Sequence, residues 1–293
     1  MKNITILAAG GDARQVYVCS ELSPRYRVYA YMTKTAPAGA ETVSELSKLQ
    51  GRVDVLILPL LTAVRHTEEG SFIPAGTEKL ILDTLMPTLK PGALVLGGAA
   101  DKETRELFTS RGFEFEDYFK RRELILRNCI PTAEGALKIA IEERSETVFG
   151  SRVLITGFGN VAKAAARLLS AAGAEVCCAV RRSDAAAEAE CSGYSSIMLS
   201  KLCEHIGSFD IIVNTVPARV IGREELECAG SGCLVIDLAS LPGGVDFSAA
   251  KELGIRTVHA LALPGKVAPA AAGRYIAETA EIILSERGVG NVT

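Results

Sequence analysis

Short apolar runs alternate with helical patterns along this chain, and the alternation occurs twice. In the first half, apolar runs at 4–9, 53–58 and 93–96 predict strands, and residues 78–89 and 102–111 have helical patterns. Few polar residues interrupt the apolar runs, which is typical of strands buried on both faces of a parallel sheet. The first half therefore predicts one βα domain.

The second half repeats this organisation. Its five runs rich in Val and Ile, each followed by a helical or turn segment, are "RVLITG", "AEVCCAV", "DIIVNTVP", "CLVIDLAS" and "RTVHALAL". They predict a second parallel sheet covered by helices. The fold class is therefore α/β with two domains: a Rossmann-type doubly wound parallel sheet, preceded by a smaller Rossmann-like or flavodoxin-like βα domain.

Two helical segments link these predicted domains. "IPTAEGALKIAIEER" predicts a connecting helix with Pro131 at its start and Thr132 as a possible cap. A helical pattern that stops at Gly288 predicts a terminal helix that returns to the first domain. We expect an N-terminal substrate and partner domain over 1–129, a connecting helix and turn over 130–150, and an NADP-binding domain over 151–266, with helix 267–288 joining the first domain.

Composition favours a protein that acts on a small molecule. Lys plus Arg number 32 against 35 Asp plus Glu, and no run of like charge forms a patch for nucleic acid or a membrane surface. The longest apolar run, 55–64, is too short to cross a bilayer. The cysteines lack metal-ligand spacing, so we expect no metal and buried, reduced thiols in a cytoplasmic protein: Cys19, Cys129, Cys177, Cys178, Cys191, Cys203, Cys228 and Cys233.

The segment "VLITGFGNVAKAAA" carries a dinucleotide fingerprint. Gly157 allows a tight turn from strand to helix, Gly159 lets the backbone approach a pyrophosphate, and Ala162 stands where a third glycine is usual. A strand precedes the motif and a helical pattern follows it, which strengthens the prediction. The remaining cofactor contacts are expected in this turn and in the loops that follow later strands: Phe158, Asn160, Val161, Thr215, Val216, Pro217, Leu238, Ala239, Ser240 and Pro264.

The end of the next strand indicates which dinucleotide is bound. An NAD enzyme places Asp or Glu there for the ribose 2′-hydroxyl, whereas this chain has Arg181, Arg182 and Ser183. Guanidinium groups bind a 2′-phosphate through paired hydrogen bonds, so NADP is the predicted cofactor. The alternative is that both arginines are simply solvated.

Several motifs together resemble the family formed by the A subunits of dipicolinate synthase from spore-forming bacteria. They are "GGDARQ", "IPTAEG", "GFG", "NTVP", "DLASLPGGVDF" and "LPGKVAPAAAG", spread over essentially the whole chain. The resemblance implies an NADP-dependent oxidoreductase that works with the flavoprotein-like B subunit of dipicolinate synthase in the mother-cell cytoplasm during sporulation. It also implies oxidation of dihydrodipicolinate, or its hydrated precursor, to dipicolinate. We also expect a homo-oligomer.

A small dicarboxylate heterocycle as substrate needs cationic and amide donors. We expect substrate contacts from Gly11, Asp12, Arg14, Asn128, Thr132 and Ser240. Glu134 is the candidate acid or base, and Lys266 is the second candidate catalytic residue. Simpler roles remain open for each, because Arg14 could pair with Asp12, Glu134 could serve a helix start, and Lys266 could be solvated.

Two other functions are consistent with the same pattern. A D-2-hydroxyacid or alanine dehydrogenase shares the two-domain plan, but neither His205 nor His259 stands at a convincing catalytic position. A non-catalytic NADP sensor would need the fingerprint and no chemistry. Turnover of the cofactor with a dihydrodipicolinate-generating system would separate the sensor from an enzyme.

Overall fold

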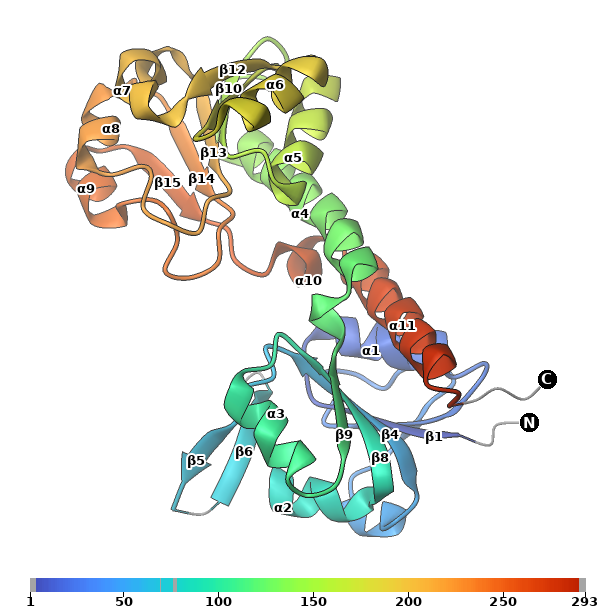
Figure 1. Cartoon of the computed structure of the whole chain (residues 1–293). Coiled ribbons are helices and arrows are strands. Elements are labelled where there is room, and N and C mark those ends of the chain that lie inside the picture. The colour runs from blue at the N-terminus through green and yellow to red at the C-terminus, as the bar shows by residue number, and fades with distance from the viewer. Residues whose placement is uncertain (1–3, 69, 76–77, 290–293) are drawn as a thin grey trace. The chain divides into compact units, whose positions relative to one another are not determined.

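The computed structural model describes residues 4–68, 70–75 and 78–289, which form two compact units (Figure 1). Unit 1 comprises the residues up to Asn128 together with those from Ala268 onward, and unit 2 comprises Cys129–Val267. The chain therefore passes from one unit to the other twice. The prediction that the first domain is smaller was wrong, because the C-terminal helix belongs to unit 1 and makes it the larger one.

Unit 1 is built on a parallel six-stranded sheet. Its strands are β1 (Thr5–Ala9), β2 (Arg27–Tyr31), β3 (Glu41–Thr42), β4 (Val53–Leu60), β8 (Leu89–Gly98) and β9 (Glu114–Asp117). The spatial order is β3-β2-β1-β4-β8-β9. Counted along the chain, this is the 3-2-1-4-5-6 order of dinucleotide-binding sheets, and it differs from the flavodoxin order.

Helices cover both faces of this sheet. Helices α1 (Ala13–Leu22) and α11 (Pro269–Glu286) pack on one face, where Gly273 lets them approach closely: a Cβ there would lie 2.5 Å from the carbonyl oxygen of Arg14. The other face is covered by α2 (Leu82–Leu85), α3 (Lys102–Thr109) and the 3₁₀ turns η1 (Leu46–Leu49) and η2 (Met86–Thr88). A further 3₁₀ turn, η3 (Tyr118–Lys120), follows β9.

A three-stranded antiparallel sheet is inserted between β4 and α2. It consists of β5 (Arg65–Thr67), β6 (Gly70–Ala75) and β7 (Glu78–Ile81). The helix predicted over 78–89 was therefore wrong: its first part pairs with β6, and only a single turn of α-helix follows. The buried side chains of Ile73 and Leu80 join the core of unit 1, which explains why tertiary packing overrides the helical pattern.

Unit 2 contains a second parallel six-stranded sheet. Its strands are β10 (Arg152–Thr156), β11 (Glu175–Val180), β12 (Ser195–Met198), β13 (Ile211–Asn214), β14 (Leu234–Asp237) and β15 (Arg256–His259). The order β12-β11-β10-β13-β14-β15 is again 3-2-1-4-5-6. The predicted Rossmann-type parallel sheet is confirmed.

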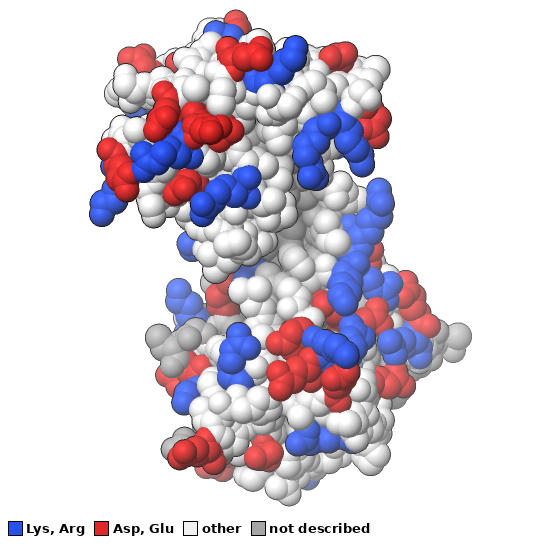
Figure 2. Space-filling view, turned by 60° about the vertical axis from the view of Figure 1, so that its left-hand side comes forward, with Lys and Arg blue, Asp and Glu red and all other residues white. Residues whose placement is uncertain are grey.

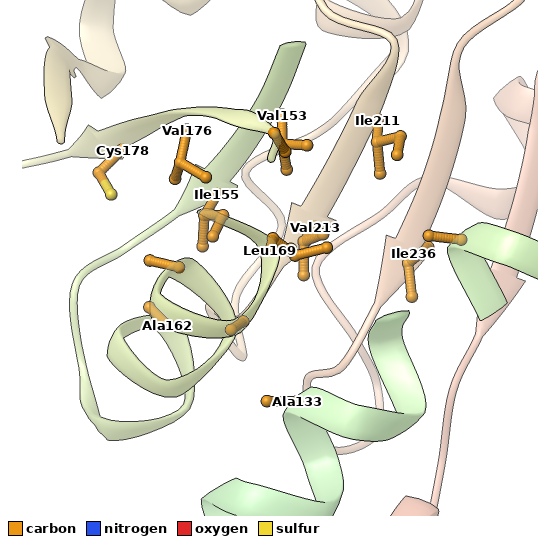
Figure 3. Close-up of a cluster of buried hydrophobic side chains, with 14 of the residues drawn as sticks. Ala133, Val153, Ile155, Ala162, Leu169, Val176, Cys178, Ile211, Val213 and Ile236 are labelled. Atoms are coloured by element: carbon orange, nitrogen blue, oxygen red, sulfur yellow. The ribbon is translucent and has the colours of Figure 1, made fainter. Parts of the chain in front are cut away.

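The core of unit 2 lies on both sides of this sheet. On one side, Val153, Ile155 and Val213 extend toward Ala162 and Leu169 of α5 (Figure 3). The other side is covered by α7, α8 and α9. Besides the second part of α4 (Arg122–Glu142), the helices of this unit are α5 (Asn160–Ala171), α6 (Ser183–Cys191), α7 (Leu202–His205), α8 (Arg223–Cys228), α9 (Phe247–Glu252) and α10 (Leu263–Val267), with 3₁₀ turns η4 (Leu199–Lys201) and η5 (Ile206–Ser208).

The predicted connecting helix begins earlier than the sequence indicates. Helix α4 spans Arg122–Glu142, so Pro131 and Thr132 lie inside it and neither starts it. The fully buried Leu124 packs into the core of unit 1 and fixes the first turn there. Pro131 lacks the N–H that would reach the carbonyl of Arg127, but the helix continues on both sides of this position.

The surface carries charged side chains of both signs and several cysteines. Lys and Arg side chains are interspersed with Asp and Glu on the face drawn in Figure 2. All eight cysteines are free, but the expectation that all are buried was wrong, because Cys191, Cys203 and Cys228 are exposed. These three lie on the short helices α6, α7 and α8.

Candidate functional site: the carboxyl edge of the second sheet

The turn between β10 and α5 has the geometry that a dinucleotide requires. Gly157 has φ +83°, and its N–H donates to the carbonyl oxygen of Ala179 at 2.7 Å. A Cβ on Gly157 would lie 3.2 Å from Thr215 Oγ1 and from Val216 Cγ2, so a side chain would crowd the neighbouring loop. Glycine is needed here both for its backbone conformation and for the close approach.

Gly159 opens the site instead. It is the residue directly before α5 and has φ −82°, and a Cβ at this position would meet no atom within 4 Å. Having no side chain, it accepts no hydrogen bond from the first N–H groups of the twelve-residue α5. This arrangement suits a phosphate group. Asn160 and Val161 form the first turn, and Phe158 is buried, with Lys163 Nζ 5.3 Å from the centre of its ring.

A row of polar residues runs across the ends of four neighbouring strands. Thr156, Asn214, Asp237 and His259 are register partners on β10, β13, β14 and β15. Thr156 Oγ1 donates to Asn214 Oδ1 at 2.5 Å, and Asn214 Nδ2 donates to Asp237 Oδ1 at 2.7 Å. The first three residues are fully buried. The row therefore fixes the strand ends from which the site loops depart.

Asp237 shapes the loop that follows β14. Its carboxylate also accepts hydrogen bonds from the amides of Ala239 at 3.0 Å and Gly244 at 2.8 Å. The loop between them exposes Ser240, whereas Ala239 is buried and Leu238 is half-buried. Asp237 thus acts as a loop cap.

His259 is held by its neighbours within unit 2. Its Nε2 lies 3.3 Å from the carbonyl oxygen of Ala239, and its ring stacks on Phe247 with 5.0 Å between ring centres. His205 is exposed at the end of α7.

The arginines predicted to read the cofactor differ in their surroundings. Arg181 borders a depression of the surface, whereas Arg182 Nε donates to Asp184 Oδ1 at 3.0 Å. Ser183 is exposed and begins α6. The depression also contains side chains that sequence reasoning did not identify: Met198, Leu199, Ser200, Arg219, Val220 and Arg223.

Arg219 is the most informative of these residues. Its side chain is 69% exposed, and its Nη1 lies 3.3 Å from Asp246 Oδ2. The amide of Ala249 lowers the pKa of Asp246, and the charge of Arg219 acts in the same direction. The signal in the sequence was the continuation of "NTVP" into "NTVPAR", which places a cation after the loop that follows β13. Thr215 and Val216 are half-buried in that loop and Pro217 is exposed.

The candidate substrate residues of unit 1 form a compact turn. Gly11 has φ +95°, and Asp12 caps α1 by accepting from the amide of Arg14 at 3.0 Å. Arg14 Nη2 also lies 2.7 Å from Asp12 Oδ2, and its side chain is only 9% exposed. Burial raises the pKa of Asp12, but the hydrogen bond and charge of Arg14 outweigh it and leave this pKa below its usual value. Arg14 therefore has the simpler partner that the sequence allowed.

The candidate residues of α4 differ in burial. Asn128 is buried, Thr132 is half-buried and Glu134 is exposed. Helix α10 packs against α4 at Gly135, where a Cβ would lie 2.8 Å from Leu263 Cδ1. Lys266 is exposed on the last turn of α10, and Pro264 is half-buried on its first turn.

Two kinds of site are not found in the described part of the chain. Within residues 4–68, 70–75 and 78–289, His, Cys, Asp and Glu side chains nowhere gather in groups of three or more that could hold a metal ion. In the same ranges, no helix is long and apolar enough to cross a membrane.

Comparison with known families divides the chain close to the boundary between the units. Residues 5–119 match the N-terminal domain of the A subunit of dipicolinate synthase. Residues 132–239 match the NAD binding domain of D-isomer specific 2-hydroxyacid dehydrogenases. Unit 2 is therefore a dehydrogenase-like NAD(P)-binding domain.

Individual relatives cover nearly the whole chain. The A subunit of dipicolinate synthase from Bacillus subtilis strain 168 is 29% identical over 98% of this chain and 97% of its own length. The crystal structure of the A subunit from Bacillus halodurans matches with a TM-score of 0.85 and 28% identity, over 97% of this chain and 98% of that one. A transhydrogenase from Sinorhizobium meliloti shares the fold, with a TM-score of 0.71 at 16% identity over 98% and 94% of the two chains.

Proposed function

Because this chain belongs to the family of dipicolinate synthase A subunits, we propose that it oxidises dihydrodipicolinate, or its hydrated precursor, to dipicolinate with NADP as hydride acceptor. The observation that carries the proposal is the glycine turn of unit 2, with open space before the N-terminus of α5. Oxidation of a dihydropyridine removes a hydride and a proton and yields an aromatic ring. The protein therefore mainly has to position the ring and accept the proton.

The residues present fit a dinucleotide phosphate. The amides at Gly157–Gly159 and the start of α5 would hold the pyrophosphate, because a Cβ on Gly159 would meet nothing within 4 Å. Arg181 would bind the 2′-phosphate, with Arg182 and Ser183 beside it and Arg219 across the same depression. When bound, NADP supplies the hydride acceptor. Further contacts are proposed from the loops after β13 and β14: Thr215, Val216, Pro217, Leu238, Ala239 and Ser240, with Pro264 on α10.

Glu134 is proposed as the proton acceptor. Its carboxylate is exposed on α4, beside Gly135, where α10 packs. Lys266 and Arg14 are proposed to bind substrate carboxylates, with Gly11, Asp12, Asn128, Thr132 and Ser240 as additional contacts. For Arg14 this requires the guanidinium to exchange its bond with Asp12 for one with the substrate.

The biological setting is part of the same proposal. The Bacillus subtilis relative is named as one subunit of its enzyme, which supports a multi-subunit assembly, and we propose the B subunit of dipicolinate synthase as the partner. We further propose a homo-oligomer that works in the cytoplasm of the mother cell during sporulation.

A reconstituted assay tests the reaction. Aspartate semialdehyde, pyruvate, dihydrodipicolinate synthase, the B subunit of dipicolinate synthase and NADP are combined with this chain, and dipicolinate is quantified by chromatography. We expect dipicolinate that requires this chain, and more of it with NADP than with NAD. A reaction that forms no dipicolinate, although each other component is shown to be active, would falsify the proposal.

A matched pair of variants tests the role of Glu134. Glu134→Gln should lower the turnover number at least tenfold and leave NADPH affinity unchanged, because it removes only the proton acceptor. Glu142→Gln, an exposed residue on the same helix, serves as the control. Equal turnover by the two variants would exclude Glu134 as the base.

A further inference from the structure

Two exposed cysteines from different helices of unit 2 are neighbours. Cys203 lies on α7 and Cys228 is the last residue of α8, and the two helices pack against each other. Both residues are exposed, and the two thiols lie close enough for Cys228 to shift the pKa of Cys203. Nothing in the proposed oxidation of the substrate uses either thiol.

The packing of the chain around these cysteines is close. A Cβ on Gly207, in the turn after α7, would lie 2.7 Å from the carbonyl oxygen of Cys228. Only glycine lets the turn approach the end of α8 this closely. The buried side chains of Leu202, Ile206 and Leu226 belong to one core cluster and hold both segments in place. The core therefore holds the two helices that carry the cysteines side by side.

The other cysteines differ in ways that make them controls. Burial raises the pKa of Cys19, Cys178 and Cys233 to about 12, so these thiols stay protonated and inaccessible. Desolvation by neighbouring atoms and then the Cys228 thiol raise the pKa of Cys203 to about 11, although its side chain is exposed. A thiol with a raised pKa is the poorer nucleophile at neutral pH, so we expect Cys228 to attack first.

We propose that Cys203 and Cys228 form a reversible dithiol–disulfide site that exchanges with low-molecular-weight disulfides. In the first step, the Cys228 sulfur attacks one sulfur of glutathione disulfide, and one glutathione leaves as a thiolate. In the second step, Cys203 attacks the mixed disulfide and displaces the second glutathione. One disulfide is reduced, one is formed, two electrons pass to glutathione, and the two cysteine protons end on the two glutathione thiols.

The bond would tie one end of α8 to α7. The opposite end of α8, at Arg223–Glu225, borders the depression that also contains Arg181. A disulfide at Cys228 therefore anchors the helix whose first turn forms part of that depression. This inference does not depend on the proposed function, because it concerns only the thiols of unit 2.

Peptide mapping after incubation of the whole protein with glutathione disulfide tests the site. Trypsin releases Cys203 in peptide 202–219 and Cys228 in peptide 224–251. We expect these two peptides to be joined, with the loss of two hydrogens, and to separate again after dithiothreitol. Fragmentation of the joined pair should place the bond on Cys228, since the same peptide contains the buried Cys233.

Three variants sharpen the result. Cys203→Ser should trap glutathione on Cys228, because the second step is removed. Cys228→Ser should leave Cys203 largely unmodified, because it removes the first nucleophile. Cys191→Ser should still give the joined peptides. In the wild type, the exposed Cys191 should form a mixed disulfide with glutathione that stays in place. Circular dichroism checks that each variant is folded. Stable glutathione on both Cys203 and Cys228, or no reaction at either while Cys191 is modified, would overturn the proposal.

Discussion

The two units have the same sheet order but treat its carboxyl edge differently. In unit 2, the turn after β10 opens at Gly159, where a Cβ would touch nothing. In unit 1, Asp12 rather than a glycine caps the helix, and the turn after β1 is filled: a Cβ on Gly10, the counterpart of Gly157, would lie 2.7 Å from Ala75 Cβ and 2.8 Å from Leu80 Cδ1. Both of those contacts come from the inserted antiparallel sheet.

Other groups of unit 1 occupy the same edge. Gln15 Nε2 donates to the carbonyl oxygen of Ile57 at 2.9 Å, and the fully buried Tyr118 donates its hydroxyl to that of Leu58 at 3.1 Å. The switch point between β1 and β4 is therefore satisfied by protein groups. Strand order alone does not make a dinucleotide site, because what covers the strand ends decides whether a ligand has access.

The largest expected effect comes from the buried aspartates that organise the two edges. Asp237 accepts from Asn214, Ala239 and Gly244, and Asp117 of unit 1 accepts from the amides of Ala99, Ala100 and Phe119. Either change to Ala leaves buried donors unpaired and should lower the free energy of unfolding by about 3–5 kcal/mol. Urea unfolding followed by circular dichroism measures this loss.

Only one of these variants should affect the cofactor. Asp237→Ala should also abolish NADPH binding, because it releases the loop that contains Ser240. Asp117→Ala should leave the affinity for NADPH within about twofold of the wild-type value, because the loop held by Asp117 belongs to unit 1. Asp237→Asn provides the milder comparison, since it keeps one acceptor oxygen. If Asp117→Ala loses NADPH binding while unit 2 remains folded, the statement that only the sheet edge of unit 2 serves the cofactor is wrong.

A pair of glycine variants probes the two turns directly. Gly10→Ala should lower the free energy of unfolding by about 2–4 kcal/mol, because φ is +66° and the new methyl group meets Ala75 and Leu80. Gly159→Ala should change it by less than about 0.5 kcal/mol, since φ is −82° and the space is open. The methyl group should nevertheless weaken NADPH binding at least tenfold, about 1.4 kcal/mol. Thermal unfolding and titration of NADPH fluorescence measure the two effects, and equal losses of stability would mean that the turns are equivalent.

Cofactor choice should change less. Arg181→Asp should weaken NADPH binding by about 1.5–3 kcal/mol, because a carboxylate replaces a charge-assisted donor to the 2′-phosphate. It should improve NADH binding, since a carboxylate accepts from a free ribose hydroxyl. Arg167→Asp, the same charge change on an exposed residue of α5, is the control. Equal affinity of the wild type for NADPH and NADH would mean that Arg181 does not select the cofactor.

The smallest expected effect is the pH dependence of the turn in unit 1. Arg14 holds the folded pKa of Asp12 below 3.8, so the ion pair stabilises the fold fully above about pH 4 and is lost as pH falls through the lowered pKa. Asp12→Asn keeps the helix cap and removes the charge. The free energy of unfolding of the wild type should exceed that of this variant by about 0.2–1 kcal/mol at about pH 6. The difference, measured by urea unfolding, should be smaller below about pH 4. A gap that widens on acidification would contradict the assigned sign.

The parallel sheets were predictable because their strands are buried on both faces. Val153–Ile155 and Ile211–Val213 are uninterrupted apolar runs, and burial explains why no polar residue interrupts them. The edge strand β12 (Ser195–Met198) gave no such signal: it is partly exposed and was missed. In β7, Lys79 is exposed and Leu80 buried, an alternation too short to distinguish a strand from a helix.

The candidate site was only partly predictable. The glycines could be identified from the sequence because a positive φ angle or a close approach of neighbouring atoms requires glycine at that position. The bond between Asn214 and Asp237 could not, since these residues are 23 positions apart and meet only because β13 and β14 are neighbours. Arg219 was missed for the same reason, because its position matters only in a depression assembled from separate segments of the chain.

The return of α11 to unit 1 fixes the order in which the chain can fold during synthesis. Residues 129–267 of unit 2 are contiguous, whereas unit 1 needs α11, which is translated after all of unit 2. Until then, α1 lacks the helix that packs at Gly273 and the core lacks Ile276 and Ile283. In a ribosome-bound chain from which residues 1–267 have emerged, we expect unit 2 to resist protease. Residues 1–128 should remain sensitive to it. Unit 1 can therefore complete its fold only after α11 has been synthesised, so unit 2 folds first. This reverses the usual N-to-C order of domain folding.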